Sequence, residues 1–332
     1  MDSSRPLADK LSEAPPAHGA RLDWQAVPGR VRVAVEQWAG CGVADVASQP
    51  TGFSPGVAAR VLLADGRRVF VKAIGPVPNR DSPSMHRREA RIVAAVPANA
   101  PVPRLLWTYD EGDGGWVVLV FEDIDGRHPV QPWDRGELER VVDALAAMAA
   151  ALTPSPLPIA TVPSAGDALG GWLRGWQPIR DEQPPQFARL DAWSARHLDA
   201  LADLEHSAAA AVAGETLLHF DVRADNVLLT DDRVWFVDWP HACVGAAWLD
   251  VVCFAPSVTM QGGPPPEAVI AHHPACRAAD PLAITAAVAA VAGYLTHRAL
   301  QPPPPGLPTV RAFQAAQGVV AREWLARQTG WS

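Results

Sequence analysis

Residues 217–239 read LLHFDVRADNVLLTDDRVWFVDW, and this stretch predicts a short β-hairpin around which the fold is built. Two apolar runs, Val227–Leu229 and Val234–Val237, flank Thr230-Asp231-Asp232, whose composition is typical of a turn. A hairpin brings its two ends together, so polar residues before the first strand and after the second are expected to converge. These residues are Asp221, Asn226 and Asp238.

The converging side chains indicate a chemistry. Two carboxylates and an amide at one point suit a hard cation such as Mg²⁺ and the removal of a hydroxyl proton. The spacing His219-x-Asp221-x-x-x-x-Asn226, followed by Asp238 at the end of an apolar strand, is the arrangement of kinase catalytic and metal-binding residues.

Composition limits the class of protein. The chain has 332 residues, enough for one large domain or two moderate ones, and 48% are hydrophobic, which is ample for a core. The net charge is -8 and no run of Lys and Arg occurs, which argues against nucleic acid or an anionic membrane as a partner. We expect a monomer or a homodimer that binds small molecules.

The cysteines and the apolar runs predict a cytoplasmic protein. The four cysteines show neither metal-ligand spacing nor the density of a secreted scaffold, so we expect reduced thiols. Residues 1–19 lack the apolar core of a signal peptide. No apolar run reaches the ~18 residues that a membrane-spanning helix needs.

The segment after the first 20 residues predicts a β-rich lobe. A turn with Gly52 and Gly56 stands between segments that we expect to be strands. Residues 60–74 are predicted to form a hairpin around Asp65-Gly66. Lys72 lies in the second strand of this hairpin and is one of only two lysines in the chain. A compact ammonium fits between phosphate oxygens better than a planar guanidinium, so we interpret Lys72 as a phosphate ligand. The alternative is a solvated Lys on an edge strand.

Two further features complete a nucleotide site. A helix is expected from about Ser84 to Val96, and in kinases a helix Glu pairs with the strand Lys, which gives Glu89 its predicted role. Local pairing of Glu89 with a neighbouring Arg is the alternative. The apolar strand 116–121 runs into Glu122-Asp123-Ile124-Asp125-Gly126, a hinge in which the backbone near Glu122 and Ile124 would be open to an adenine edge.

The remainder predicts a larger helical lobe. The capping-box-like start Asp134-Arg135-Gly136-Glu137 predicts a helix over 134–152. We expect further helices over 190–212, from 248, over 282–300, where an Ala-rich stretch indicates a core helix, and over 310–327. The predicted fold class is α+β with two lobes. The predicted boundaries are a disordered tail over 1–20, a nucleotide-binding lobe over 21–121, a hinge over 122–126 and a catalytic, acceptor-binding lobe over 127–332.

These residues resemble the aminoglycoside phosphotransferase family, which shares the protein-kinase-like fold with choline kinases. Four motifs in order carry the resemblance, over about residues 51–324: Lys72, Glu89, the run from His219 to Asn226, and Val237-Asp238-Trp239. The resemblance implies an ATP-dependent, Mg²⁺-requiring kinase of a small hydroxylated molecule.

The resemblance also implies roles for individual residues. Asp221 would be the catalytic base, while Asn226 and Asp238 would hold Mg²⁺. Lys72, held by Glu89, would bind the α- and β-phosphates. Arg223 would stabilise charge on the transferred phosphoryl group or, alternatively, is an exposed Arg. His219 would tie the catalytic loop to the Asp238 segment. Asp250 would brace the loop or, alternatively, is an ordinary Asp at a helix N-terminus.

Three departures from the family pattern stand out. Phe220 occupies a position where the family commonly has Gly. Asp238-Trp239-Pro240 replaces the Asp-Phe-Gly of protein kinases, which argues against a mobile activation switch. The loop with Gly52 and Gly56 does not fit Gly-x-Gly-x-x-Gly, so an ordinary hairpin turn is the alternative to a phosphate-covering loop.

The acceptor is less clearly indicated. An aminoglycoside is a polycation and needs an acidic pocket, but residues 251–332 hold three acids and five arginines. Residues 167–205 hold seven acids against four arginines and include Trp172, Trp176 and Trp193, which could form a sugar-stacking wall or core packing. A nucleotide-binding pseudoenzyme is the competing class. A protein kinase is disfavoured because Asp238 and Asp250 leave no room for an activation loop.

Overall fold

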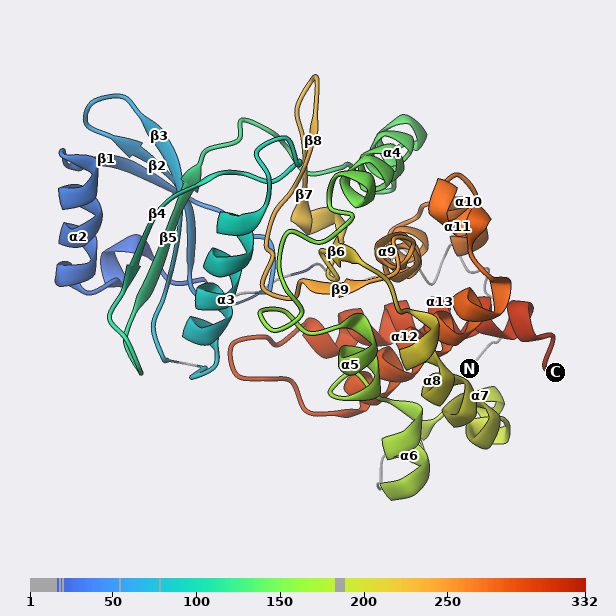
Figure 1. The fold of residues 1–332 in the computed structure, drawn as a ribbon. Helices are drawn as coiled ribbons and strands as arrows, with labels where there is room; N and C mark the ends of the chain where they lie inside the picture. Colours follow the sequence, from blue (N-terminus) through green and yellow to red (C-terminus); the bar gives the residue numbers. More distant parts are fainter. Residues whose placement is uncertain (1–16, 18, 20, 54, 78, 183–188) are drawn as a thin grey trace.

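The computed structural model describes residues 17, 19, 21–53, 55–77, 79–182 and 189–332. Most of the predicted tail, including Lys10, lies outside the described residues. The backbone carbonyl of Ala17 accepts a hydrogen bond of 3.1 Å from the Gly52 amide, so the end of the predicted tail contacts the glycine-containing loop. The fold is α+β, as predicted, with a β-rich part and a larger helical part (Figure 1).

The β-rich part is one antiparallel sheet of five strands in the order β1-β2-β3-β5-β4. The strands are β1 (Val43–Ser48), β2 (Val57–Leu63), β3 (Arg68–Ile74), β4 (Leu105–Asp110) and β5 (Val117–Glu122). Strand β4 starts only at Leu105, after Pro101 and Pro103, because proline cannot donate to a ladder. The Asp65-Gly66 turn joins β2 to β3, and Gly66 there has φ +88°, which Gly adopts without strain.

Helices cover the two faces of this sheet (Figure 1). The short η1 (Trp24–Ala26) and α2 (Gly29–Ala39) pack an apolar stripe, including Val31 and Val35, into a core shared with the sheet. The helix α3 (Ser82–Ala95) packs against β3, β4 and β5 and buries Ile92 and Val93 in a second core. This places α3 between the sheet and the helical part (Figure 1).

The helical part contains α4 (Arg135–Ala151), α5 (Ala165–Gly170), α6 (Trp176–Glu182), α7 (Ala192–Arg196), α8 (Leu198–Ala211), α9 (Leu249–Met260), α10 (Pro266–Ala271), α11 (Pro274–Ala278), α12 (Pro281–Leu300) and α13 (Val310–Thr329). Two small antiparallel pairs lie among them: β6 (Thr216–Leu218) with β9 (Cys243–Gly245), and β7 (Val227–Leu229) with β8 (Val234–Phe236). The Asp134 carboxylate caps α4 by accepting a hydrogen bond from the Glu137 amide, as the sequence predicted.

The single helix predicted over 190–212 is wrong. The chain forms α7 and α8, which are separated at His197, whose φ of −104° and ψ of 14° depart from helical geometry. The cause is tertiary, because the His197 ring packs 5.3 Å from Trp331 at the other end of the chain. Trp193 also reaches this end and donates a hydrogen bond of 3.0 Å to the Trp331 carbonyl.

Helix α12 is the central element of the helical part. By length and composition alone it could cross a membrane, but that test is also passed by core helices of soluble proteins. It packs against α13, α8, α6 and α9, and its buried positions include Ile284, Val288 and Leu295. It is therefore a core helix of this fold, as its Ala-rich sequence predicted.

Candidate active site

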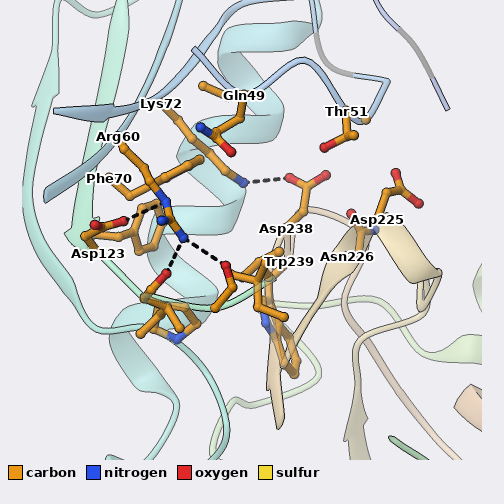
Figure 2. A pocket seen from close by; sticks show the side chains of 18 of the residues that line it. Gln49, Thr51, Arg60, Phe70, Lys72, Asp123, Asp225, Asn226, Asp238 and Trp239 are labelled. Atoms are coloured by element: carbon orange, nitrogen blue, oxygen red, sulfur yellow. Dashed lines mark hydrogen bonds and ion pairs between the residues drawn. The ribbon is translucent and has the colours of Figure 1, made fainter. Parts of the chain in front are cut away.

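The hairpin β7–β8 brings the polar residues together as predicted. The Val227↔Phe236 pair sets its register, and the Val237 amide donates a hydrogen bond of 2.9 Å to the Asn226 carbonyl. Asn226 and Asp238 therefore stand at one end of the hairpin, and both line the same cleft (Figure 2).

The loop before the hairpin is held by buried polar contacts. The Asp250 carboxylate accepts hydrogen bonds from the amides of His219 (2.9 Å) and Phe220 (2.8 Å). The His219 ring, through Nε2, lies 2.9 Å from the Val237 carbonyl and so ties the loop to the segment of Asp238. Burial lowers the pKa of His219, which keeps the ring neutral, and raises the pKa of Asp250. The bracing contacts expected of both residues are present.

Both unusual backbone positions of the site have positive φ. Phe220 has φ 64° and Asp238 has φ 71°, and these are the non-Gly residues with positive φ in the described part of the chain. The left-handed region is costly for residues with a Cβ. The position where the family commonly has Gly therefore keeps a glycine-like conformation despite carrying Phe.

Asp221 lies in a network of charged groups. One carboxylate oxygen accepts a hydrogen bond from Nη1 of Arg223, and the other lies 3.3 Å from the Asn226 amide nitrogen. Arg223 also forms a two-pronged ion pair with Asp225, with both contacts at 3.0 Å. The Arg223 side chain is only 13% exposed, so the alternative of a solvated surface Arg is wrong. Its charge lies beside the predicted base.

Lys72 joins the two lobes of the site. Its Nζ lies 2.7 Å from Oε1 of Glu89 on α3 and 2.7 Å from Oδ1 of Asp238 (Figure 2). Burial lowers the pKa of Lys72, but the two carboxylates raise it by more. The net shift is upward, so the ammonium stays charged. Burial raises the pKa of Asp238, but the charge of Lys72 outweighs it and holds this pKa well below its usual range. For Glu89 burial is the larger effect, and its pKa is raised.

The cleft between the lobes has a volume of about 380 Å³. Its lining combines polar residues around Asp238 with apolar residues of β3, β5 and β7, such as Phe70, Phe121 and Leu228. A cleft with both apolar and charged lining suits a nucleotide, which has an apolar base and charged phosphates.

Most of the predicted hinge lines the cleft, namely Glu122, Asp123, Ile124 and Gly126. Glu122 is the last residue of β5; its amide donates to the Arg104 carbonyl and its carboxylate accepts from Arg104. The Ile124 carbonyl accepts hydrogen bonds from the Gly126 amide (2.8 Å) and from Nη2 of Arg60 (2.6 Å). Within the described residues the Ile124 amide has no backbone hydrogen-bond partner.

Gly52 and Gly56 have different surroundings. Gly52 lines the cleft with φ +94°, and a Cβ there would stand 3.0 Å from Nη2 of Arg21. Gly56 is buried against β3, where a Cβ would meet the Ala73 carbonyl at 2.7 Å. A glycine is therefore required at position 56 because the loop packs closely on the sheet there. Gly52 instead lies in the cleft, near Arg21 and Asp225.

Sequence reasoning missed several residues of the cleft. Arg21, Arg60, His86 and Asp225 all line it. Arg60 ties β2 to the hinge through the carbonyls of Ile124 and Gly126 and through Asp123, 3.2 Å away (Figure 2). Asp225 lies inside the quoted stretch next to Asn226, which could have indicated its position. Arg21 precedes every recognisable motif, so no sequence signal marked it.

The donor set fits a hard cation. Nδ2 of Asn226 donates to the Asp221 carbonyl at 2.8 Å, which leaves Oδ1 of Asn226 as an available oxygen ligand. Asp238 supplies an ionised carboxylate. Among the residues described, no cluster of three or more His, Cys, Asp or Glu side chains gathers at one point. Two protein oxygens match Mg²⁺, which is usually held by one or two carboxylates together with substrate phosphates.

Of the described residues in 167–205, no acid or tryptophan lines this cleft. Glu205 is buried and accepts hydrogen bonds from the amides of Gly175, Trp176 and Gln177, so it caps α6. Asp203 is exposed. Trp176 is fully buried and donates to the Ala289 carbonyl, which makes it a core residue. The weak support that this segment gave to a polycationic acceptor is not borne out by these positions.

The chain belongs to the phosphotransferase enzyme family, whose model matches residues 51–286. Among curated proteins none matches the sequence closely. Three solved structures show the same protein-kinase-like fold. An aminoglycoside phosphotransferase, APH(4)-Ia, in complex with AMP-PNP and hygromycin B is 15% identical with a TM-score of 0.58, over 92% of this chain and 100% of that one.

The other two are also distant in sequence. A spectinomycin phosphotransferase, APH(9)-Ia, in complex with ADP and spectinomycin is 10% identical with a TM-score of 0.54, over 92% of this chain and 100% of that one. A choline/ethanolamine kinase family protein from Mesorhizobium loti is 16% identical with a TM-score of 0.54, over 91% and 93% of the two chains. At such identities the likeness shows the fold alone.

Proposed function

We propose that this protein transfers the γ-phosphoryl group of ATP to a hydroxyl of a small molecule. One observation carries the proposal: Asn226 and Asp238 line the same cleft as the Lys72–Glu89 ion pair, and Asp221 contacts Asn226. These parts come from both lobes, and together they are what phosphoryl transfer requires. The fold and the family membership support the same reaction class.

The residues have separate tasks in this mechanism. Asn226 and Asp238 would hold Mg²⁺, which would offset the negative charge of the nucleotide phosphates. Lys72, positioned by Glu89, would bind phosphate oxygens, and the apolar side chains of the cleft, together with the Ile124 amide, would take the base. Gly52 would allow the loop to approach the phosphates closely.

Asp221 would orient the acceptor hydroxyl and accept its proton as the oxygen attacks the γ-phosphorus in line. The hydroxyl oxygen forms the new bond to phosphorus, the bond from the γ-phosphorus to the bridging oxygen breaks, and ADP leaves. Arg223, adjacent to Asp221, would offset the negative charge on the equatorial oxygens.

The test is Asp221→Asn. We expect phosphoryl transfer to fall by roughly 10²–10⁴-fold, the usual contribution of a positioned general base, while the affinity for Mg-ATP stays within about twofold because Asp221 is not assigned to the nucleotide. Transfer is measured by phosphate label on acceptors, with aminoglycosides, macrolides, choline-like amines and sugars as the panel. Asp231→Asn, an exposed residue at the hairpin turn, is the matched control.

Near-normal turnover in Asp221→Asn would show that another group is the base. If the wild-type protein binds Mg-ATP but phosphorylates nothing, the competing class, a nucleotide-binding pseudoenzyme, is favoured. The filled catalytic positions argue against that class. We further infer that the protein acts in the cytoplasm, where ATP is available.

A further inference from the structure

A group of aromatic and cationic side chains lies next to the predicted base and takes no part in the mechanism above. Its members are Tyr294 and Arg298 on α12 and Arg311 on α13, which we call the basic wall. Trp172, between α5 and α6, adjoins it and is 47% exposed. The position of these residues relative to Asp221 decides what acceptor can bind.

A chain of contacts connects the wall to the Asp238 segment. His241 stands three residues after Asp238, and its ring lies 6.2 Å from the ring of Trp172. The Trp172 carbonyl accepts a hydrogen bond of 3.2 Å from Nη2 of Arg298. The Arg298 guanidinium in turn lies 5.5 Å from the centre of the Tyr294 ring. The wall therefore begins beside the predicted metal ligand.

A second chain of contacts connects the wall to the catalytic loop. The Arg223 guanidinium lies 5.4 Å from the ring of Phe53, and this ring meets Phe313 of α13 edge to face at 5.3 Å. Arg311, two residues before Phe313, is fixed by hydrogen bonds to the Pro302 carbonyl (3.0 Å) and to Gln314 (2.9 Å). Helix α13, which carries Arg311, therefore packs through Phe313 and Phe53 toward Arg223, the neighbour of Asp221.

Electrostatic interactions at Tyr294 agree with this placement. Burial raises the pKa of Tyr294, and the Asp221 carboxylate acts in the same direction, whereas Arg298, Arg311 and Arg223 lower it.

The wall also has unused hydrogen-bond donors. In the described chain the Tyr294 hydroxyl has no hydrogen-bond partner, and Nε of Arg298 is buried without one. Three candidate counter-charges for a polycation lie elsewhere: Glu205 caps α6, Asp191 caps α7 and pairs with Arg322 at 3.0 Å, and Asp203 is exposed beside Arg180. Glu182, the last residue of α6, is the exception, because it opposes the effect of Arg298 and Arg311 on the pKa of His297. The wall therefore has two guanidinium groups, with Glu182 as an acid near them.

We propose that the acceptor is a hydroxylated molecule that also carries a negative charge, a carboxylate or a phosphate ester, which Tyr294, Arg298 and Arg311 bind. An anion gains from charge-assisted hydrogen bonds with guanidinium groups, and a polycation would meet like charges. This inference rests on the proposed phosphoryl transfer, because it assumes that the acceptor reacts beside Asp221.

The experiment compares three ligands that share one hydroxylated ring and differ in charge: glucose 6-phosphate, glucose and glucosamine. Each is titrated calorimetrically into the protein after saturation with Mg-AMP-PNP, whose own binding is measured first. Wild type is compared with Arg298→Gln/Arg311→Gln. The control is Arg135→Gln, which removes a surface charge on α4 whose side chain is 89% exposed.

We expect wild type to bind glucose 6-phosphate at least tenfold more tightly than glucose or glucosamine. The double variant should lose about ten- to a hundredfold of that affinity, as for lost hydrogen bonds to a charged group, while Arg135→Gln matches wild type. Any of three results would overturn the inference. Wild type could bind glucosamine more tightly than glucose 6-phosphate, it could fail to bind glucose 6-phosphate, or the double variant could bind glucose 6-phosphate as tightly as wild type does. Failure of Mg-AMP-PNP to bind would instead contradict the proposed function.

Discussion

At the scale of single residues, backbone conformation at Phe220 departs from what its side chain favours. The left-handed conformation, with φ 64°, exposes both the Phe220 and His219 amides to the Asp250 carboxylate. Local strain of this kind persists where surrounding contacts determine it, and it is common at active sites. The loop that carries Asp221 is therefore shaped by its contacts and not by glycine.

Phe220→Gly and Phe220→Ala separate strain from packing. Both lose the same ring contacts, but only Ala keeps the cost of a Cβ at positive φ, so we expect the Gly variant to be more stable by about 1 kcal/mol. Urea unfolding of the two proteins measures the difference. Equal stability, or a more stable Ala variant, would show that Phe220 carries no backbone strain.

At the scale of elements, one buried acid explains how α6 is attached to the helical core. The Glu205 carboxylate on α8 accepts three hydrogen bonds, of 2.7, 3.1 and 2.9 Å, from the first amides of α6 and the residue before it. Burial raises the pKa of Glu205, and the amide donors oppose this shift. A carboxylate at a helix N-terminus is favoured by both hydrogen bonding and the helix dipole.

Glu205→Leu tests this attachment. The substitution leaves buried amides without acceptors, each costing roughly 1–3 kcal/mol, so we expect a loss of at least about 3 kcal/mol in the free energy of unfolding. Asp203→Asn on the same helix, whose side chain is 83% exposed, should change it by less than about 0.5 kcal/mol. Chemical denaturation measures both, and a mild effect at Glu205 would mean that α6 is held by packing alone.

At the scale of the whole molecule, the interface between the lobes contains a buried histidine whose ionisation links stability to pH. Burial is the main cause that lowers the pKa of His86 to about 4, and the Lys72 and Arg21 charges act in the same direction, opposed by Asp238 and by a hydrogen bond with the Ser82 backbone. The unfolded state, with a pKa near 6.5, binds more protons between about pH 4 and 6.5. Stability must therefore fall as the pH decreases through this window.

We expect His86 to account for a loss of roughly 2 kcal/mol on going from pH 8 to pH 5. His86→Gln should flatten the stability profile between pH 4 and 6.5, because no ring remains to be protonated on unfolding. The control is His206→Gln, at an exposed position on α8. Unfolding free energies across pH measure the effect, and parallel profiles for wild type and His86→Gln would contradict it.

Much of the fold could be predicted because its signals are local. Asp65-Gly66 between two β-prone runs predicts the β2–β3 hairpin, and the apolar stripe of α4 starts at the N-cap Asp134. The failures have a common cause. The junction at His197 depends on packing against Trp331, and the three amides that Glu205 binds are about thirty residues away in sequence. Neither contact leaves a periodic signal.

The site, like the fold, has one part that the sequence predicted and another that only the structure revealed. The sequence by itself determined the catalytic stretch and the family, because Asp221, Asn226 and Asp238 have a fixed spacing around one hairpin, and Lys72 is conspicuous in an Arg-rich chain. Only the tertiary structure decided the surroundings. Arg223 lies against the base, Arg60 holds the hinge, and the arginines of α12 and α13 lie near Asp221. The physical reason is separation along the chain. The predicted base and metal ligands lie close together in the sequence, whereas the charged groups around them come from distant segments that meet only in the folded chain.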